Sequence, residues 1–193
     1  VAHFFETQII KDFHLAALNL IRRHSIEANF GIRHALESLS LFVYSMEHKS
    51  EKEYVFERDE NHIIDFDHKL LGKAFAHIEK RYPLFSKEIE MYRSSINALY
   101  SHSNIFSSQY NTAIIDGRIK FLLFDSYYDK FIWEYLCILN EIICLTLEVY
   151  KKLFEDYHPF EFEDWFGKEL EECFMRQDKL KSDMISELSR ENR

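Results

Sequence analysis

The residues best suited to chemistry lie between Arg93 and Asn104, where the sequence reads RSSINALYSHSN. This segment places a guanidinium, several hydroxyls and amides, and the imidazole of His102 near the end of a predicted helix. A solvent-facing imidazole exchanges protons near neutral pH, as general acid or base catalysis requires. The segment therefore predicts a site for proton transfer on an anionic substrate.

The spacing within this segment assigns roles to five residues. Arg93 and Asn97 are four positions apart, so they share one helix face and could bind one anionic group together. Asn97 and His102 lie about 140° apart around a helix and about 7.5 Å apart along it, so they would flank a groove. We therefore expect His102 and Asn97 to be catalytic, and Arg93, Ser101 and Asn104 to bind substrate. The alternative is that these residues only end a helix, with Arg93 at the surface.

A second group, His62, Asp65, Asp67 and His68, could be interpreted as a metal site. It spans a loop end and a helix start, and it lacks two histidines on one helix face, as in H-E-x-x-H. Helix capping explains these residues better. The sequence also contains no Gly-rich phosphate loop, Walker motif or G-x-S-x-G motif. We therefore expect no metal and no cofactor.

The longest apolar stretch, Asp129 to Leu153, must lie at the centre of the fold. Its polar residues Glu134, Glu141 and Glu148 recur every seven positions and form one narrow stripe on a helix. Three carboxylates would be costly in lipid, so the stretch predicts a buried helix rather than a membrane span. A carboxylate-bridged metal pair would need Glu-x-x-His partners, which the sequence lacks. The stripe should therefore face water, or Lys and Arg of a neighbouring helix.

The other elements follow from periodicity and turn residues. Apolar residues at helical spacing predict further helices over residues 3–23, 26–46, 67–81, 86–100 and 161–189. The predicted apolar face of the first helix consists of Phe4, Ile9, Phe13, Leu15, Leu18 and Ile21. Residues 48–65 predict an exposed loop with room for a short hairpin around 59–61. The Asp-Gly dipeptide within TAIIDGRIKFLLF predicts a β-hairpin over residues 112–124.

Together these elements predict a mainly α protein. We expect an up-and-down helical bundle over residues 1–157 with one short β-hairpin. An extra C-terminal amphipathic helix, in residues 158–193, would pack on the bundle or on a partner.

Composition narrows the functional classes. The chain has 193 residues and a net charge of -9, which argues against broad adhesion to nucleic acid or to an anionic membrane surface. Its 47% hydrophobic content excludes a disordered chain. The three cysteines include no C-x-x-C pair, which predicts reduced, buried thiols in a cytoplasmic protein. The sequence shows no secretory h-region and no apolar segment that reads as a transmembrane span, so we expect no membrane partner.

Two stretches and the order of elements resemble a known family. IRHALESLSLF, with Arg33 and Glu37, precedes YSHSN, a hairpin, FDSYYD and a long apolar helix. This order resembles bacterial HEPN-like (higher eukaryote and prokaryote nucleotide-binding) domains over residues 5–155. The resemblance implies a helical bundle, generally a homodimer, in a toxin–antitoxin, abortive-infection or CRISPR-linked system. Active members are metal-independent ribonucleases with an Arg, an adjacent polar residue and a downstream His.

Residue by residue, the resemblance assigns acid or base transfer at the RNA 2′-hydroxyl and the leaving oxygen to His102. Asn97 stands where the family motif has its arginine, and an amide cannot replace a guanidinium on the scissile phosphate. Arg93 lies one turn earlier, about half a revolution from His102.

Three hypotheses follow. The first is a variant ribonuclease with a site composed across a dimer, whose RNA would meet a local basic patch of Arg22, Arg23, Arg33 and Arg93. The second is a non-catalytic oligomeric regulatory bundle that binds a protein partner from the same operon. The third is a module that binds a small anion at Arg93 and Asn97.

Overall fold

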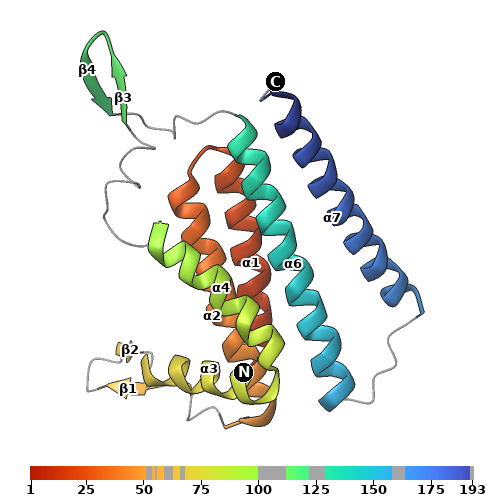
Figure 1. Ribbon diagram of the computed structural model, residues 1–193. Coiled ribbons are helices and arrows are strands. Elements are labelled where there is room, and N and C mark those ends of the chain that lie inside the picture. Colours follow the sequence, from red (N-terminus) through yellow and green to blue (C-terminus); the bar gives the residue numbers. More distant parts are fainter. Residues whose placement is uncertain are drawn as a thin grey trace. The chain divides into compact units, whose positions relative to one another are not determined.

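The computed structural model describes residues 1–50, 54, 56–58, 63–65, 68–99, 112–121, 129–157 and 164–191 (Figure 1). Within these residues the helices are α1 (Ala2–Ile21), α2 (Ser25–Glu47), α3 (His68–Arg81), α4 (Pro83–Leu99), α6 (Asp129–Tyr157) and α7 (Asp164–Glu191). The strands are β1 (Phe56–Arg58), β2 (Ile63–Asp65), β3 (Thr112–Ile115) and β4 (Arg118–Phe121). The predicted mainly α class is confirmed.

The chain forms two compact bodies, which are described separately. The first comprises residues 1–15 and 29–102, and so contains the start of α1, most of α2, the β1–β2 pair, α3 and α4. The second comprises residues 16–28 and 103–193, with the β3–β4 pair, α6 and α7. The predicted division into residues 1–157 and 158–193 stays a prediction.

Helix α1 buries only part of the apolar face that the sequence predicts. Ile9 and Phe13 of that face are buried, and so is Phe5, which lies outside it. The predicted face members that are instead exposed are Phe4, Leu15, Leu18 and Ile21. Apolar residues occupy both sides of this helix, so periodicity alone does not determine which side is covered. The covered side is the one that carries Asp12, whose carboxylate binds His34 of α2.

Helices α3 and α4 pack against each other around a turn at Tyr82. Their buried residues include Leu70, Ala74 and Ile78 of α3 and Ile89 and Ile96 of α4. The sequence places the start of the second helix at residue 86, but α4 begins at Pro83. Proline suits a first helical position because its missing N–H would have no partner there and its φ is already helical.

In the second body, α6 and α7 pack against each other through a polar contact at the predicted carboxylate stripe. Lys181 Nζ of α7 lies 2.7 Å from Glu141 Oε1 of α6, and this hydrogen bond raises the pKa of Lys181. Gln177 is only 4% exposed, and it bonds to Asn140, to the Cys137 carbonyl at 3.2 Å and to Glu141 at 3.3 Å. This part of the stripe therefore faces polar residues of a neighbouring helix.

The cysteines lie on the same two helices. Cys137 and Cys144 of α6 are buried, Cys173 of α7 is half-buried, and none forms a disulfide. Burial raises the pKa of both α6 thiols. Protonated thiols are poor nucleophiles and poor metal ligands, so these two residues serve packing.

Two antiparallel strand pairs complete the described residues. β3 pairs with β4 in the register Thr112 with Phe121, and the connecting residues Asp116 and Gly117 have φ of 54° and 70°. Positive φ at both positions is what an Asp-Gly turn supplies. β1 pairs antiparallel with β2 in the register Phe56 with Asp65, inside the segment 48–65 for which the sequence predicts an exposed loop with room for a short hairpin.

Candidate functional site

The predicted substrate-binding residue Arg93 is engaged in contacts within the first body. Its Nη1 lies 2.7 Å from Glu90 Oε2, and its guanidinium carbon lies 4.2 Å from the centre of the Phe75 ring. The Arg93 side chain is only 24% exposed. The contact with Phe75 holds α4 against α3. The Glu90 carboxylate offsets the positive charge of Arg93 that would bind an anion.

The other predicted residues divide into two groups. Asn97 lies on α4, half-buried, one turn after Arg93. Ser101, His102 and Asn104 lie outside the described residues. The structure therefore brings Arg93 and Asn97 onto one helix, and the predicted pairing of Asn97 with His102 stays a prediction.

The first body contains a cleft of about 530 Å³ in which Arg33 is a lining residue, here called the Arg33 cleft. Its lining comes from α1, α2 and α3: Phe4, Phe5, Gln8, Arg33, His34, Glu37, Ser38, Leu41 and Leu71. The lining combines aromatic side chains of α1 with polar side chains of α2. The size suits a single nucleotide or a molecule of similar size.

Within the Arg33 cleft, His34 is oriented by a buried carboxylate. His34 Nδ1 lies 2.7 Å from Asp12 Oδ2, and Gln8 Nε2 donates to Asp12 Oδ1 at 2.9 Å. The Asp12 side chain is 7% exposed, whereas that of His34 is 58% exposed. An ionised carboxylate only accepts hydrogen bonds, so Nδ1 of the neutral imidazole carries the proton. Nε2 is then left with a lone pair that can accept a proton from a substrate.

Arg33 is fixed beside this histidine. Its Nε donates to Glu37 Oε1 at 2.9 Å, one turn further along α2. The two side chains are 34% and 17% exposed, so the pair is partly buried. Within the described part of the chain, Nε is the only guanidinium nitrogen of Arg33 that forms a hydrogen bond. The two terminal nitrogens can therefore bind an oxyanion in the cleft.

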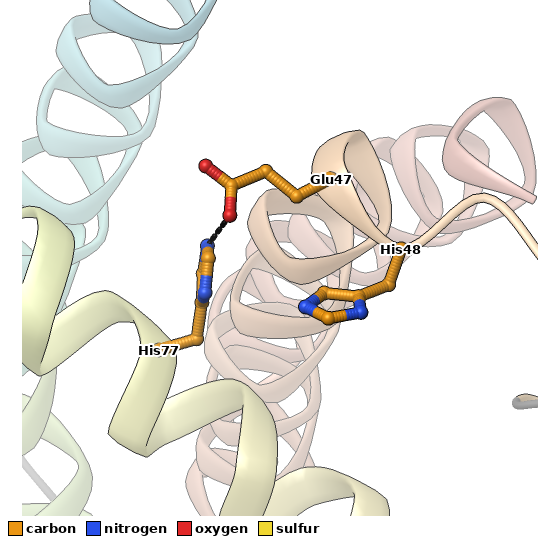
Figure 2. Close-up of side chains that lie close together, drawn as sticks. All are labelled: Glu47, His48 and His77. Atoms are coloured by element: carbon orange, nitrogen blue, oxygen red, sulfur yellow. Dashed lines mark ion pairs between the residues drawn. The ribbon is translucent and has the colours of Figure 1, made fainter.

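A second polar group in the first body consists of Glu47, His48 and His77, here called the histidine cluster (Figure 2). Glu47 ends α2, His48 follows it, and His77 projects from α3. One donor atom from each residue lies within 4.8 Å of the other two. His77 Nε2 lies 3.5 Å from Glu47 Oε2, and the geometry falls short of a hydrogen bond.

Burial determines the charge state of His77. Its side chain is 14% exposed, and burial lowers the pKa of His77; the nearby cations Arg81 and Lys80 act in the same direction, and Glu47 opposes them. His77 is therefore neutral at neutral pH. Sequence spacing does not reveal this cluster, because Glu47 and His48 are adjacent but His77 lies on another helix, far from them along the chain. The available signal was that His77 falls at the spacing of the buried residues Ala74 and Ile78.

Comparison with known protein families, with curated proteins and with solved structures found no match to this chain. None of the helices in the described ranges combines the length and the apolar character that crossing a membrane requires.

Proposed function

We propose that this chain is a cytoplasmic HEPN-like protein, an up-and-down bundle of a bacterial defence or toxin-type system, that binds RNA and cleaves it without a metal ion. The supporting observation is the Asp12–His34 pair at the Arg33 cleft. An imidazole oriented by a carboxylate can transfer a proton, and a guanidinium beside it can stabilise a phosphate, as phosphodiester transfer requires.

In this proposal His34 Nε2 takes the proton of a ribose 2′-hydroxyl, and the 2′-oxygen attacks the adjacent phosphorus. The bond from phosphorus to the 5′-oxygen breaks, which leaves a 2′,3′-cyclic phosphate. The resemblance assigns the proton for the leaving oxygen to His102. The terminal N–H groups of Arg33 stabilise the phosphate oxygens as charge develops.

Phe4 supplies a surface for the base. Its ring lines the Arg33 cleft and the residue is 73% exposed. Stacking of one base on an exposed aromatic ring contributes about 1–3 kcal/mol and tolerates any base. Such binding suits a protein of net charge -9, because it depends less on counterion release than binding through many phosphates.

The test is cleavage of a labelled single-stranded RNA in EDTA. We expect His34→Ala, Arg33→Met and His102→Ala each to reduce the rate by about 100-fold or more, because acid–base groups contribute that much. His14→Ala is the matched control, since His14 is an exposed α1 histidine bonded only to its own helix. Equal cleavage by the wild type and His34→Ala would refute the role of the Arg33 cleft. Absence of cleavage in all proteins would refute the activity.

A second candidate function is a non-catalytic homodimer that regulates a protein partner from the same operon. Exposed apolar residues of α1 support it: Phe4, Ile10 and Leu15 are 73%, 50% and 44% exposed, on the side of the helix away from Ile9. An exposed apolar face of this kind suits a second copy of the chain. Light scattering should then report a dimer for the wild type and a monomer for Ile10→Lys. A wild-type monomer would contradict this function.

A further inference from the structure

The histidine cluster shares no residue with the Arg33 cleft, and its side chains are those that bind borderline metal ions. Figure 2 shows the carboxylate of Glu47 above the His77 imidazole, with the His48 ring reaching toward the same place. We propose that Glu47, His48 and His77 bind one Zn²⁺ ion, with an exchangeable ligand such as water in the fourth position. This proposal does not depend on the proposed function.

The donor geometry suits this ion. Zn²⁺ binds imidazole nitrogen and carboxylate oxygen at about 2.0–2.2 Å, so two donors of a tetrahedral site are about 3.3–3.5 Å apart. His77 Nε2 and Glu47 Oε2 are already 3.5 Å apart. The three donors lie within 4.8 Å, so a shift of about 1 Å by a side chain at the end of α2 completes the set. Two histidines and one glutamate with an open position form a ligand set that zinc sites use.

Aromatic packing holds both imidazoles in place. The Tyr44 ring stacks on His48 at 4.0 Å with an angle of 11°, and it meets the His77 ring edge-on at 5.6 Å. The hydroxyl of the buried Tyr54 donates to the His48 carbonyl at 2.6 Å, which fixes the backbone of that ligand. Ligands that are held before the ion arrives cost less entropy to organise.

The ligand atoms favour zinc over magnesium or calcium. Arg81 Nε lies 3.8 Å from Glu47 Oε1, on the carboxylate oxygen that does not face His77, so it can orient the ligand from outside. Arg81 and Lys80 also oppose any cation electrostatically. A site with two imidazoles and one carboxylate binds Zn²⁺ through nitrogen, whereas Mg²⁺ and Ca²⁺ need more oxygen ligands.

Zinc bound here would link the end of α2 to α3. An ion that binds the folded chain and not the unfolded chain stabilises the fold in proportion to the logarithm of its concentration. The expected consequence is a zinc-dependent melting temperature.

The test uses the full chain stripped with EDTA and dialysed. We expect ZnCl₂ to bind at about one ion per chain by calorimetry and to raise the melting temperature, and Co²⁺ to give the strong visible absorption of a tetrahedral site. Glu47→Gln, His48→Ala and His77→Asn should each weaken zinc binding by about 10-fold or more, because the loss of a residue that only orients a metal ligand already costs that much, and these three residues bind the ion directly. His14→Ala should bind like the wild type.

Melting in EDTA separates loss of ligand from loss of fold, since a variant that melts like the wild type without metal is folded. Three results would overturn the proposal. The first is no zinc binding by the wild type, the second is equal binding by all three ligand variants, and the third is an equal temperature shift with MgCl₂.

Discussion

His34 Nδ1 of α2 lies 2.7 Å from Asp12 Oδ2 of α1, although the two residues are 22 positions apart in the sequence. The second oxygen of Asp12 accepts a hydrogen bond from Gln8, so the nearly buried carboxylate has a fixed orientation. The imidazole of His34, which lines the Arg33 cleft, is thereby held in one orientation.

Asp12→Asn should reduce RNA cleavage by about 100-fold, because an amide nitrogen facing Nδ1 favours the wrong imidazole tautomer. Binding should change little, since Asp12 does not line the Arg33 cleft. The measurement pairs single-turnover cleavage with fluorescence anisotropy on the same RNA. A variant that loses affinity and keeps its cleavage rate would show that Asp12 acts on binding alone.

Gln177→Ala should lower the free energy of unfolding by about 1–3 kcal/mol, because it leaves the Asn140 amide and the Cys137 carbonyl without their buried partner. Urea unfolding followed by circular dichroism measures the change. Lys179→Ala, an exposed position on the same helix, should stay within about 0.5 kcal/mol of the wild type. If Gln177→Ala and Lys179→Ala lower the free energy of unfolding equally, the contact between α6 and α7 does not depend on Gln177.

His77 should make the metal-free protein less stable in acid. Its pKa is lowered in the folded state from the usual value of about 6.5, so near and below that pH the unfolded chain binds more protons. Its contribution is therefore complete above about pH 6.5 and is lost as the pH falls through the lowered value. The charged and titratable groups acting on it are Glu47, His48, Lys80 and Arg81.

Melting temperatures in EDTA, measured between about pH 7.5 and pH 5.5, test whether stability falls on acidification. The drop on acidification should be smaller in His77→Asn, which does not titrate. An identical drop in the variant would assign the effect to other groups.

Arg93→Ala should destabilise the first body by about 1 kcal/mol, since the side chain packs on Phe75 and pairs with Glu90. The neighbouring exposed Lys87 provides the control substitution, Lys87→Ala. If Arg93 instead holds a phosphate, as its spacing from Asn97 predicts, its loss will reduce RNA cleavage while the free energy of unfolding stays unchanged.

The helices were predictable because each depends on neighbours within two turns. The sequence places the longest helix over residues 129–153, and α6 spans Asp129–Tyr157. The exposed side of α1 was not predictable, because Phe4 and Phe5 offer apolar surface on both sides of one helix. Tertiary packing determines which of the two sides is buried, and the periodicity of one helix carries no information about that packing.

The candidate sites depend on contacts that sequence spacing does not encode. Asp12 approaches His34, and Glu47 approaches His77, only once separate helices pack together. Both Asp12 and His77 occur at the spacing of buried apolar residues, and a polar residue at such a position is the signal to look for. His102, Ser101 and Asn104 remain predictions from the sequence.

The reactivity of the Cys137 and Cys144 thiols can report when α6 becomes exposed to solvent. Both are buried with a raised pKa, so an alkylating reagent can reach them only when the helix separates from what covers it. The half-buried Cys173 on α7 should react first under native conditions. The delay before Cys137 and Cys144 react would therefore measure the rate of local opening in the second body, without any added label.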